Sequence, residues 1–487
     1  MSDRSALDAV VVGSGPNGLA AAIALAERGC SVHIVEGYPT VGGGVRSAPL
    51  TLPGFTHDVC SSVYPMVQAT PFFRTLPLAK HGVEWVHPPD LVAHPLDDGT
   101  AAVLRKSVED TAASLGEDGK AYRRLIGSLA ANSDILMADL VGPFRLPRHP
   151  LLALKFGWPA LRSGRGLAEA YFRTPAGRAL WAGLAAHAVL PLERRPGSAI
   201  ALMLAIAGHA HGWPMVRGGA QNLSNALTAH LRSLGGTIET GRWIKSIDDL
   251  PPAKVVLLDV SPRQVVALAG HKLPRGYIRR LGKYRHGPGV FKVDWALAGP
   301  IPWTAKEFRS AGTVHVGGTL EEIADAERAP FDGRLVNRPF VLLVQPSLFD
   351  PSRAPPGRHT AWGYCHVPNG FTGNMTEAME RQIERFAPGF RDLILARYVA
   401  DPAAIELYNP NCIGGDISGG VTDLGQLFTR PVARWSPYTT PNPGVFICSS
   451  STPPGGGVHG MCGYFAAQAA LKRIRPSPVK ELGAEGG

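Results

Sequence analysis

The sequence predicts an α/β fold in which a parallel sheet is assembled from separate stretches of the chain. Near the amino terminus, the apolar run Ala9–Val12 leads through a glycine-rich turn into a helix and a second strand, which makes a β-α-β unit. In the middle, Lys254–Asp259 has the continuous apolar character of a buried parallel strand. Near the carboxyl terminus, the strand Gly444–Cys448 precedes a glycine-rich loop and an apolar helix. We therefore expect a discontinuous parallel-sheet domain.

The remaining elements follow from apolar periodicity and from the residues that end helices. The first helix, Leu19–Arg28, closes at Gly29, and the strand Ser31–Glu36 follows it. Gln221–Leu234 places its apolar residues along one helical face and ends at a pair of glycines. The other expected elements are a hairpin or paired short strands at Thr237–Thr240 and Trp243–Ile247, and a helix at Tyr464–Ile474.

These elements divide the chain into three parts and a tail. The parallel-sheet domain is expected to comprise residues 1–89, 213–285 and 431–475. Residues 90–212 are expected to form a helical subdomain that faces the substrate or a membrane. Residues 286–430 are expected to form a mixed-sheet substrate domain, with strands at Phe291–Leu297 and Phe340–Gln345. Residues 476–487, rich in Pro, Glu and Gly, are expected to be a loose tail.

Composition narrows the class of protein. With 487 residues, of which 45% are hydrophobic, the chain can bury large cores but exceeds one compact domain. Its cysteines form no CxxC pair, so neither a metal site nor a disulfide framework is expected. No apolar run approaches the roughly 20 residues that a transmembrane helix needs. The charged start, with Asp3, Arg4 and Asp8, argues against a signal peptide and favours a cytoplasmic protein.

The net charge of +10 is concentrated in residues 144–178. This stretch contains seven Arg or Lys residues and a single acid, Glu169, and its basic residues are interspersed with apolar ones. Two interpretations stay open. One is peripheral contact with a membrane surface, and the other is a solvated basic face beside ordinary core residues. No nucleic-acid motif accompanies the charge, so we expect no nucleic-acid partner. The oligomeric state stays open.

The turn Gly13-Ser14-Gly15-Pro16-Asn17-Gly18 follows a strand, opens a helix and precedes an acid, Glu36, by roughly 20 residues, as in Rossmann-like dinucleotide sites. Gly13 permits the tight turn, Gly15 lets the backbone approach a diphosphate, and Gly18 lets the helix pack against the strand. The helix amino terminus favours the anionic phosphates. Glu36 would accept hydrogen bonds from the adenosine ribose, and its charge disfavours the 2′-phosphate of NADP.

A second glycine segment, Gly42-Gly43-Gly44, lies where a longer cofactor needs another close approach of the backbone, which favours FAD over NAD. At this point the chain resembles FAD enzymes of the glutathione-reductase-like fold, in which the ribose-binding acid is followed by a Gly-Gly-Arg element. Gly44 stands where many of these enzymes carry Arg. The resemblance therefore implies that any cationic role passes to Arg46.

Three further segments resemble the phytoene desaturase family of FAD oxidoreductases: Leu52–Asp58, Val216–Leu223 and Val445–Met461. The nearest branch is the pyridine nucleotide-disulphide oxidoreductase domain-containing type, related to carotenoid desaturases and isomerases. The resemblance covers most of the chain. It implies a desaturase, a dehydrogenase or a redox-neutral isomerase that transfers hydride from a small lipophilic, isoprenoid- or carotenoid-like substrate to FAD.

The resemblance also implies cofactor contacts far from the glycine turn. Ile244 falls in a segment that binds adenine through its backbone, and the loop before the last helix contacts the flavin. Relatives usually carry glycine at the positions of Ser449 and Ser451 in that loop. The expected cofactor-binding residues are Gly13, Gly15, Pro16, Asn17, Gly18, Glu36, Gly42, Gly43, Gly44, Arg46, Ile244, Ser449, Gly456, Gly457 and Val458.

The sequence identifies no catalytic residue, because a flavin itself supplies the redox chemistry. The chain has neither a second dinucleotide fingerprint of comparable quality nor a CxxC pair, so oxygen or a quinone is the expected electron acceptor. Apolar side chains between residues 150 and 212 either line a substrate pocket or belong to the core. The candidate acids and bases, each with a structural alternative, are His57, Asp58, His209, His211, Asp416 and His459.

Two other functions compete with this interpretation. A flavin amine oxidase has the same amino-terminal signature but needs an aromatic cage before the flavin. A non-catalytic binder of prenylated protein tails shares the fold, although the intact set of Gly13, Gly15, Gly18 and Glu36 argues against it.

Overall fold

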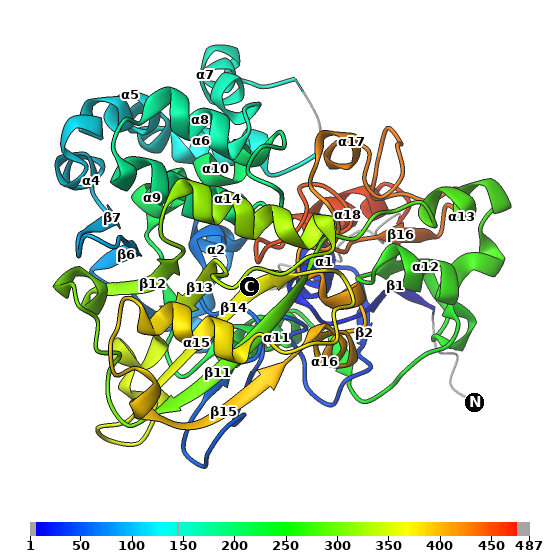
Figure 1. The fold of residues 1–487 in the computed structure, drawn as a ribbon. Coiled ribbons are helices and arrows are strands. Elements are labelled where there is room, and N and C mark those ends of the chain that lie inside the picture. The colour runs from blue at the N-terminus through cyan, green and yellow to red at the C-terminus, as the bar shows by residue number, and fades with distance from the viewer. Residues whose placement is uncertain (1–5, 144–145, 475–487) are drawn as a thin grey trace, which may run out of the picture.

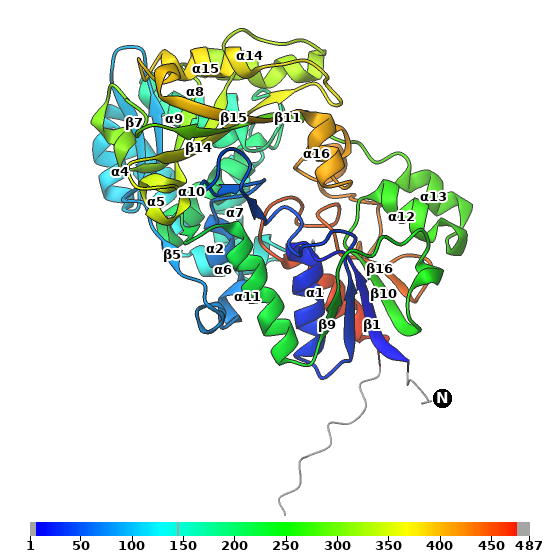
Figure 2. The ribbon, with the colours of Figure 1, turned by 90° about the horizontal axis from the view of Figure 1, so that it is seen from below.

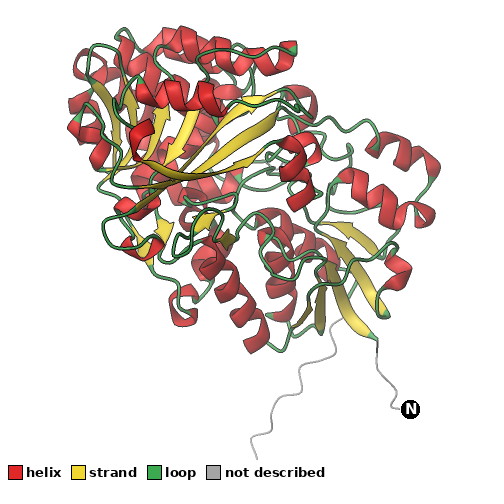
Figure 3. Cartoon of the chain, turned by 60° about the horizontal axis from the view of Figure 1, so that its bottom comes forward, coloured by secondary structure: helices red, strands yellow, loops and turns green. Residues whose placement is uncertain are grey.

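The computed structural model describes residues 6–143 and 146–474, which fold around two large sheets (Figures 1 and 3). One is a five-stranded, entirely parallel sheet in the order β16-β10-β1-β2-β9. Its strands are β1 (Leu7–Val12), β2 (Val32–Val35), β9 (Thr237–Glu239), β10 (Ala253–Leu258) and β16 (Val445–Ile447). Because these strands come from three distant stretches of the chain, the predicted discontinuous sheet is confirmed.

Helices cover both faces of this sheet, since alternate residues of a strand point to opposite sides. Val11 and Leu257 belong to the core shared with α1, α11 and α18. Their neighbours Val12 and Leu258 belong to a second core, shared with α12 and α13. Figure 2 shows α1 and α12 on the two sides of the strands. The helices are α1 (Pro16–Ala26), α11 (Ala220–Ser233), α12 (Pro262–Ala269), α13 (Arg275–Leu281) and α18 (Met461–Leu471).

The other sheet is mixed and has seven strands in the order β15-β11-β14-β13-β12-β6-β7. All neighbours are antiparallel except β12 and β6, which run parallel. The strands are β6 (Asp90–Pro95), β7 (Ala101–Arg105), β11 (Gly289–Leu297), β12 (Ala311–Val316), β13 (Val341–Val344), β14 (His359–Val367) and β15 (Ile394–Ala400). A mixed-sheet second domain was expected, and the structure has one.

Among the described residues of the stretch 108–211, seven helices pack together beside the mixed sheet (Figure 1). They are α4 (Val108–Ser114), α5 (Gly119–Ala131), α6 (Ser133–Leu140), α7 (Pro150–Ala160), α8 (Gly164–Tyr171), α9 (Pro175–Ala186) and α10 (Gly197–His211). The helical subdomain predicted for residues 90–212 is thus helical only from Val108 onward. Residues 90–105 pair as β6 and β7 at the edge of the mixed sheet, because tertiary pairing decides their conformation.

Shorter elements connect these layers. They are α2 (Pro65–Ala69), α3 (Pro71–Thr75), α14 (Leu320–Arg328), α15 (Thr376–Glu384), α16 (Pro402–Tyr408) and α17 (Leu424–Leu427), with the two-residue strands β3 (Ser47–Ala48), β4 (His57–Asp58), β5 (Trp85–Val86) and β8 (Met215–Val216).

One predicted pairing is wrong. Thr237–Glu239 does not form a hairpin with residues 243–247 but joins β2 in parallel as the edge strand β9. Residues 243–246 form no helix or strand, and the backbone then turns into a short 3-10 helix at Ile247–Asp249. The expected tail, residues 476–487, and the residues 144 and 145 of the basic stretch lie outside the described residues.

Three sequence expectations concern features of the whole chain. Within the described ranges, no helix is long and apolar enough to cross a membrane. The same ranges contain no group of three or more His, Cys, Asp or Glu residues arranged to hold a metal ion. The six cysteines are all free thiols.

Candidate functional site

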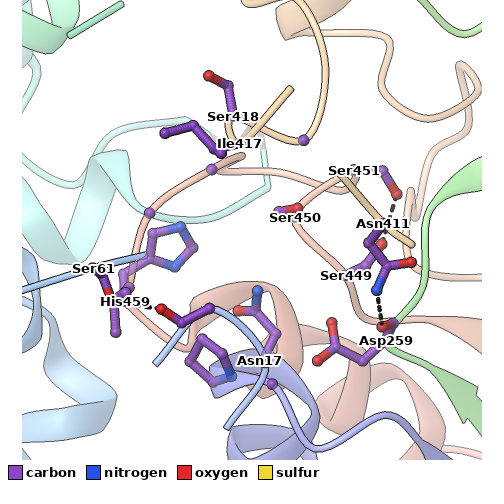
Figure 4. Close-up of a pocket in the computed structure, with 18 of the residues that line it drawn as sticks. Asn17, Ser61, Asp259, Asn411, Ile417, Ser418, Ser449, Ser450, Ser451 and His459 are labelled. Atoms are coloured by element: carbon purple, nitrogen blue, oxygen red, sulfur yellow. Dashed lines mark hydrogen bonds between the residues drawn. The ribbon is translucent and has the colours of Figure 1, made fainter. Parts of the chain in front are cut away.

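A cavity of about 810 Å³ lies between the two sheets and the helices beside them. Its walls include the carboxyl ends of the parallel strands, at Val12, Val35 and Asp259, which is where open α/β sheets bind ligands. They also include Trp362 and Tyr364 of the mixed sheet and parts of α6, α7 and α10. Figure 4 shows Asn17, Asp259, residues 449–451 and His459 around this space, with Ile417 and Ser418 across from them.

The glycine turn is shaped by close backbone contacts. Gly13 has φ +97°, a left-handed conformation that favours glycine. A Cβ at position 18 would lie 2.1 Å from the carbonyl oxygen of Gly13, so only glycine lets α1 approach β1 this closely. A Cβ at Gly43 would lie 2.9 Å from the Cα of Gly15, which shows that the two glycine segments pack directly against each other.

The amino terminus of α1 is open toward the cavity. Gly15 is its N-cap, and no side chain caps it there. Among the described residues, the backbone N–H groups of Gly15 and Asn17 have no hydrogen-bond acceptor, and the buried Oδ1 of Asn17 has no partner. Unpaired donors at a helix amino terminus form an anion site. These groups fit the diphosphate and the adjoining hydroxyls of a dinucleotide.

Glu36 holds the neighbouring turn in place. Its Oε2 accepts hydrogen bonds from the Ser14 N–H at 2.8 Å and the Ser14 hydroxyl at 2.6 Å. Its Oε1 accepts one from the Tyr38 N–H at 2.8 Å. The carboxylate is buried yet lines the cavity, so it keeps acceptor capacity for a sugar hydroxyl.

Arg46 brings a cation to the same wall. Its Nη2 lies 3.5 Å from Oε1 of Glu36. The guanidinium stands 4.4 Å from the ring centroid of Tyr38 and 5.4 Å from that of Tyr408. A Cβ at position 44 would make ordinary contact with the side chain of Cys60, at 3.8 Å, and Arg46, two residues further along the chain, is the buried cation.

Asp259 is a site residue that the sequence analysis missed. It follows β10, and its Oδ2 accepts a hydrogen bond of 2.8 Å from the Gly18 N–H. Burial raises the pKa of this carboxyl to about 7, and the nearby Glu36 contributes in the same direction. Asn411 donates to its carbonyl oxygen at 3.3 Å (Figure 4). The only sequence signal was an acid at the end of a predicted parallel strand.

The loop before α18 forms the opposite wall and is internally braced. The hydroxyls of Ser449 and Ser451 lie 2.7 Å apart (Figure 4). Nδ1 of His459 accepts from the Met461 N–H at 3.0 Å, which leaves Nε2–H to donate to the Gly455 carbonyl at 3.0 Å. Burial lowers the pKa of His459 to about 4, so this ring is neutral and supports the loop.

The structure brings most of the expected cofactor residues to one cavity. Those that line it are Gly13, Gly15, Pro16, Asn17, Glu36, Gly43, Gly44, Arg46, Ile244, Ser449, Gly456, Gly457 and Val458. Gly18 and Gly42 lie behind this lining. Gly18 is at the contact of helix with strand, and Gly42 donates from its N–H to the Ser14 carbonyl at 3.1 Å.

Most candidate acids and bases are structural. Asp58 pairs with Arg353 at 3.1 Å, and His57 lies 3.5 Å from Asp294, with its pKa lowered to about 3 by burial. His209 hydrogen-bonds to Tyr122, and His211 lies 3.3 Å from Asp134. None of these four candidates, which are His57, Asp58, His209 and His211, lines the cavity.

Asp416 does line it, as does His459. The Asp416 carboxylate accepts hydrogen bonds from the N–H groups of Gly287 at 2.8 Å, Ser418 at 2.8 Å and Gly420 at 2.9 Å. This matches the predicted alternative role of Asp416 as a turn cap.

Away from the glycine turns, the cavity is mainly apolar. His187 is a titratable side chain there, and its Nε2 lies 3.0 Å from Nε2 of His315. Burial lowers the pKa of His187 to about 4, which keeps the ring neutral. The apolar wall includes Val63, Met66, Leu136, Leu140, Ala153, Phe156, Val189, Ile200, Met203, Leu204, Leu342 and Ile417.

Known proteins share both the turn and the whole-chain architecture. Residues 11–76 match the NAD(P)-binding Rossmann-like domain family. Pyridine nucleotide-disulfide oxidoreductase domain-containing protein 2 of Mus musculus is 26% identical over 96% of this chain and 94% of its own. Phytoene dehydrogenase of Streptomyces griseus is 28% identical over 80% of this chain and 77% of its own. The chain is an FAD-dependent oxidoreductase related to the phytoene desaturases.

A solved structure adds the fold of this phytoene desaturase-related enzyme. An engineered putrescine oxidase superposes with a TM-score of 0.63 at 17% identity, covering 96% of this chain and 99% of that chain. The likeness covers nearly the whole of both chains, so the two proteins share the fold that contains both sheets. At this identity it indicates the fold and not the substrate.

Proposed function

We propose that this FAD-dependent oxidoreductase removes hydride from a lipophilic, isoprenoid-like substrate, as a desaturase, a dehydrogenase or a redox-neutral isomerase. The observation that carries the proposal is the continuity of the cavity. The wall that presents glycine backbone and helix N–H groups passes directly into one formed by Leu, Ile, Met and Val side chains. An apolar chain entering this space would lie next to the cofactor.

The chain's own residues would hold FAD in three places. The backbone at Gly13, Gly15 and Asn17, with Gly18 behind it, faces the diphosphate, and Glu36 accepts from the adenosine ribose. The adenine would lie beside Ile244. The flavin half would lie along Gly42–Arg46 and along Ser449, Gly456, Gly457 and Val458, where the amino terminus of α18 favours a negative charge. FAD, when bound, supplies hydride acceptance.

The protein's remaining task is to orient the substrate and exclude water. The apolar wall does both, because burial of hydrocarbon drives binding without needing polar partners. The neutral His187 is placed to hold a hydrogen-bonding group of a substrate. The name of the Streptomyces relative, phytoene dehydrogenase, fits this substrate class.

An amine oxidase is the second candidate, since the fold is shared with putrescine oxidase. Among the aromatic residues that line the cavity, Trp362 and Tyr364 are stacked, with ring centroids 6.1 Å apart and planes 14° apart. They are neighbours on the same face of β14, and so they lie side by side. An amine cage needs rings that face each other across the substrate, so this arrangement favours the isoprenoid-like substrate.

The test is anaerobic reduction of the purified flavoprotein. For a desaturase or dehydrogenase, the expected result is bleaching of the bound flavin by polyene or monoterpene hydrocarbons and not by aliphatic amines. For a redox-neutral isomerase, the expected result is conversion of the hydrocarbon without net bleaching. Bleaching by amines alone would replace the proposal with amine oxidation. A purified protein that lacks flavin absorption and cannot be reconstituted with FAD would instead favour the prenyl-tail binder.

A further inference from the structure

Helix α7 carries its large apolar side chains on the outside of the molecule. Leu151, Leu154, Trp158 and Leu161 follow one another at steps of three or four residues, which places them on one helical face. They are 82%, 64%, 69% and 52% exposed, and Leu146 just before the helix is 89% exposed. A helix on an ordinary protein surface shows the reverse pattern.

The inner face of the same helix belongs to the cavity. Ala153 and Phe156 line it, and so does Pro147 ahead of the helix. Phe156 is buried. In Figure 1, α7 stands at the upper edge of the molecule. It is therefore a single-helix wall with the substrate cavity on one side and an exposed apolar surface on the other.

The sequence around this helix carries mainly positive charge, and the nearest acid on its amino-terminal side is Asp139, which accepts a hydrogen bond of 3.1 Å from the Arg148 backbone N–H. The sequence has no Asp or Glu from residue 140 to residue 168. Lys155 is exposed and lies on the apolar face itself, between Leu151 and Trp158. Within the part of the chain that the structure describes, neither Lys155 nor the exposed Arg148 forms an ion pair with an acid. Their charges are available to an anionic partner.

We propose that the outer face of α7, with its flanking residues 146–149 and 161–162, docks on an anionic membrane surface. Exposed Leu and Trp side chains enter the boundary between headgroups and acyl chains, while Arg and Lys contact the lipid phosphates. The 11-residue helix lies along the surface, since it is too short to span a bilayer. Resting on the proposed function, this surface also gives a lipophilic substrate a route from the bilayer past α7 into the cavity.

The test is co-sedimentation of the purified holoenzyme with vesicles of two compositions. One is pure phosphatidylcholine, and the other is an equimolar mixture of phosphatidylcholine and phosphatidylglycerol. We expect binding to the mixed vesicles that weakens as salt is raised. Leu151→Ser combined with Leu154→Ser should lower the partition coefficient about tenfold or more, because apolar contact with the bilayer is lost.

Charge is tested separately. Lys155→Glu should weaken binding to the mixed vesicles and leave the weak binding to phosphatidylcholine unchanged. The matched controls are Leu335→Ser with Leu395→Ser, which are exposed leucines elsewhere, and Lys283→Glu, an exposed lysine after α13. The controls should bind vesicles like the wild-type protein.

Three outcomes would overturn the docking proposal. The wild-type protein does not bind mixed vesicles, the double leucine variant binds as well as the controls, or that variant abolishes a dimer seen by analytical ultracentrifugation without lipid. Leu151 and Leu154 do not line the cavity, so the double leucine variant should show unchanged reduction of the flavin by a detergent-solubilised substrate. Membrane binding without any reduction of the flavin by an isoprenoid substrate would contradict the proposed function alone.

Discussion

The side-chain oxygen Oδ2 of Asp259 lies 2.8 Å from the backbone nitrogen of Gly18, at the point where β10 ends and α1 begins. A carboxylate thus occupies the amino terminus of a helix whose neighbouring donors, on Gly15 and Asn17, are open to the cavity. Burial raises the pKa of Asp259 to about 7. The same helix end therefore serves both this carboxyl and the proposed diphosphate of FAD.

Asp259→Asn should flatten the pH dependence of FAD affinity. The folded-state pKa is raised above the ordinary value of 3.8, so the stability that protonated Asp259 contributes is present below about pH 4 and is lost as pH rises toward 7. A diphosphate disfavours the ionised carboxyl further, so FAD binding takes up a proton. Affinity of the wild-type protein, measured by flavin fluorescence, should fall as pH rises through about 7. Equal pH slopes in both proteins would contradict this assignment.

Gly18→Ala should cost about 1–3 kcal/mol of stability and release FAD, because it forces α1 away from β1. The added Cβ would meet the Gly13 carbonyl oxygen at 2.1 Å. Thermal unfolding and the flavin content of the purified protein check both effects. Gly276→Ala is the control, since a Cβ in that exposed helical position meets nothing within 4 Å. It should retain FAD and be slightly more stable.

Glu36→Gln should weaken FAD binding by about tenfold to a hundredfold, the worth of a hydrogen bond to a charged acceptor. Affinity for FMN, which has no adenosine ribose, should change much less. Isothermal titration with both flavins separates these effects. Glu27→Gln, an acid at the end of α1 that does not line the cavity, is the control. An equal loss for FMN and FAD would remove Glu36 from the ribose.

Arg430→Met should release FAD more easily with little effect on the FAD-free protein. Arg430 is fully buried, and none of the acids in the described ranges pairs with it. Its Nη2 donates to the carbonyl of Gly419 at 2.7 Å, and its Nε donates to that of Ser451 at 3.4 Å. Both of these residues line the cavity, so Arg430 joins two of its walls.

Arg353→Met provides the contrast. Arg353 is equally buried but pairs with Asp58 at 3.1 Å and Asp350 at 2.9 Å. Its removal leaves the buried Asp58 without a cationic partner and Asp350 with only Arg217, at 3.8 Å, and should destabilise the protein by about 3–5 kcal/mol with or without FAD. Urea unfolding of both forms, together with FAD release on heating, checks the pair. If Arg430→Met unfolds like Arg353→Met, its role is that of a core residue.

The difference between sequence and structure is clearest in residues 237–247 and 90–105. The pattern predicts a hairpin or paired short strands in residues 237–247 and a helical subdomain from residue 90 onward. In the structure, Thr237–Glu239 and residues 90–105 are strands that pair within larger sheets. The pattern could not indicate that Thr237–Glu239 joins β2, because the partner strand is about 200 residues away in the chain. Local propensity yields to tertiary context in such edge positions.

The sequence by itself determined the glycine turns, the acid at Glu36 and the discontinuous sheet, because strand-turn-helix geometry is encoded in neighbouring residues. Only the tertiary structure decided that Asp259, Tyr408 and His187 share a cavity with those turns. It also decided which side of α7 faces outward. Such contacts join residues far apart in the chain, and their formation depends on how whole layers pack, which no local pattern records.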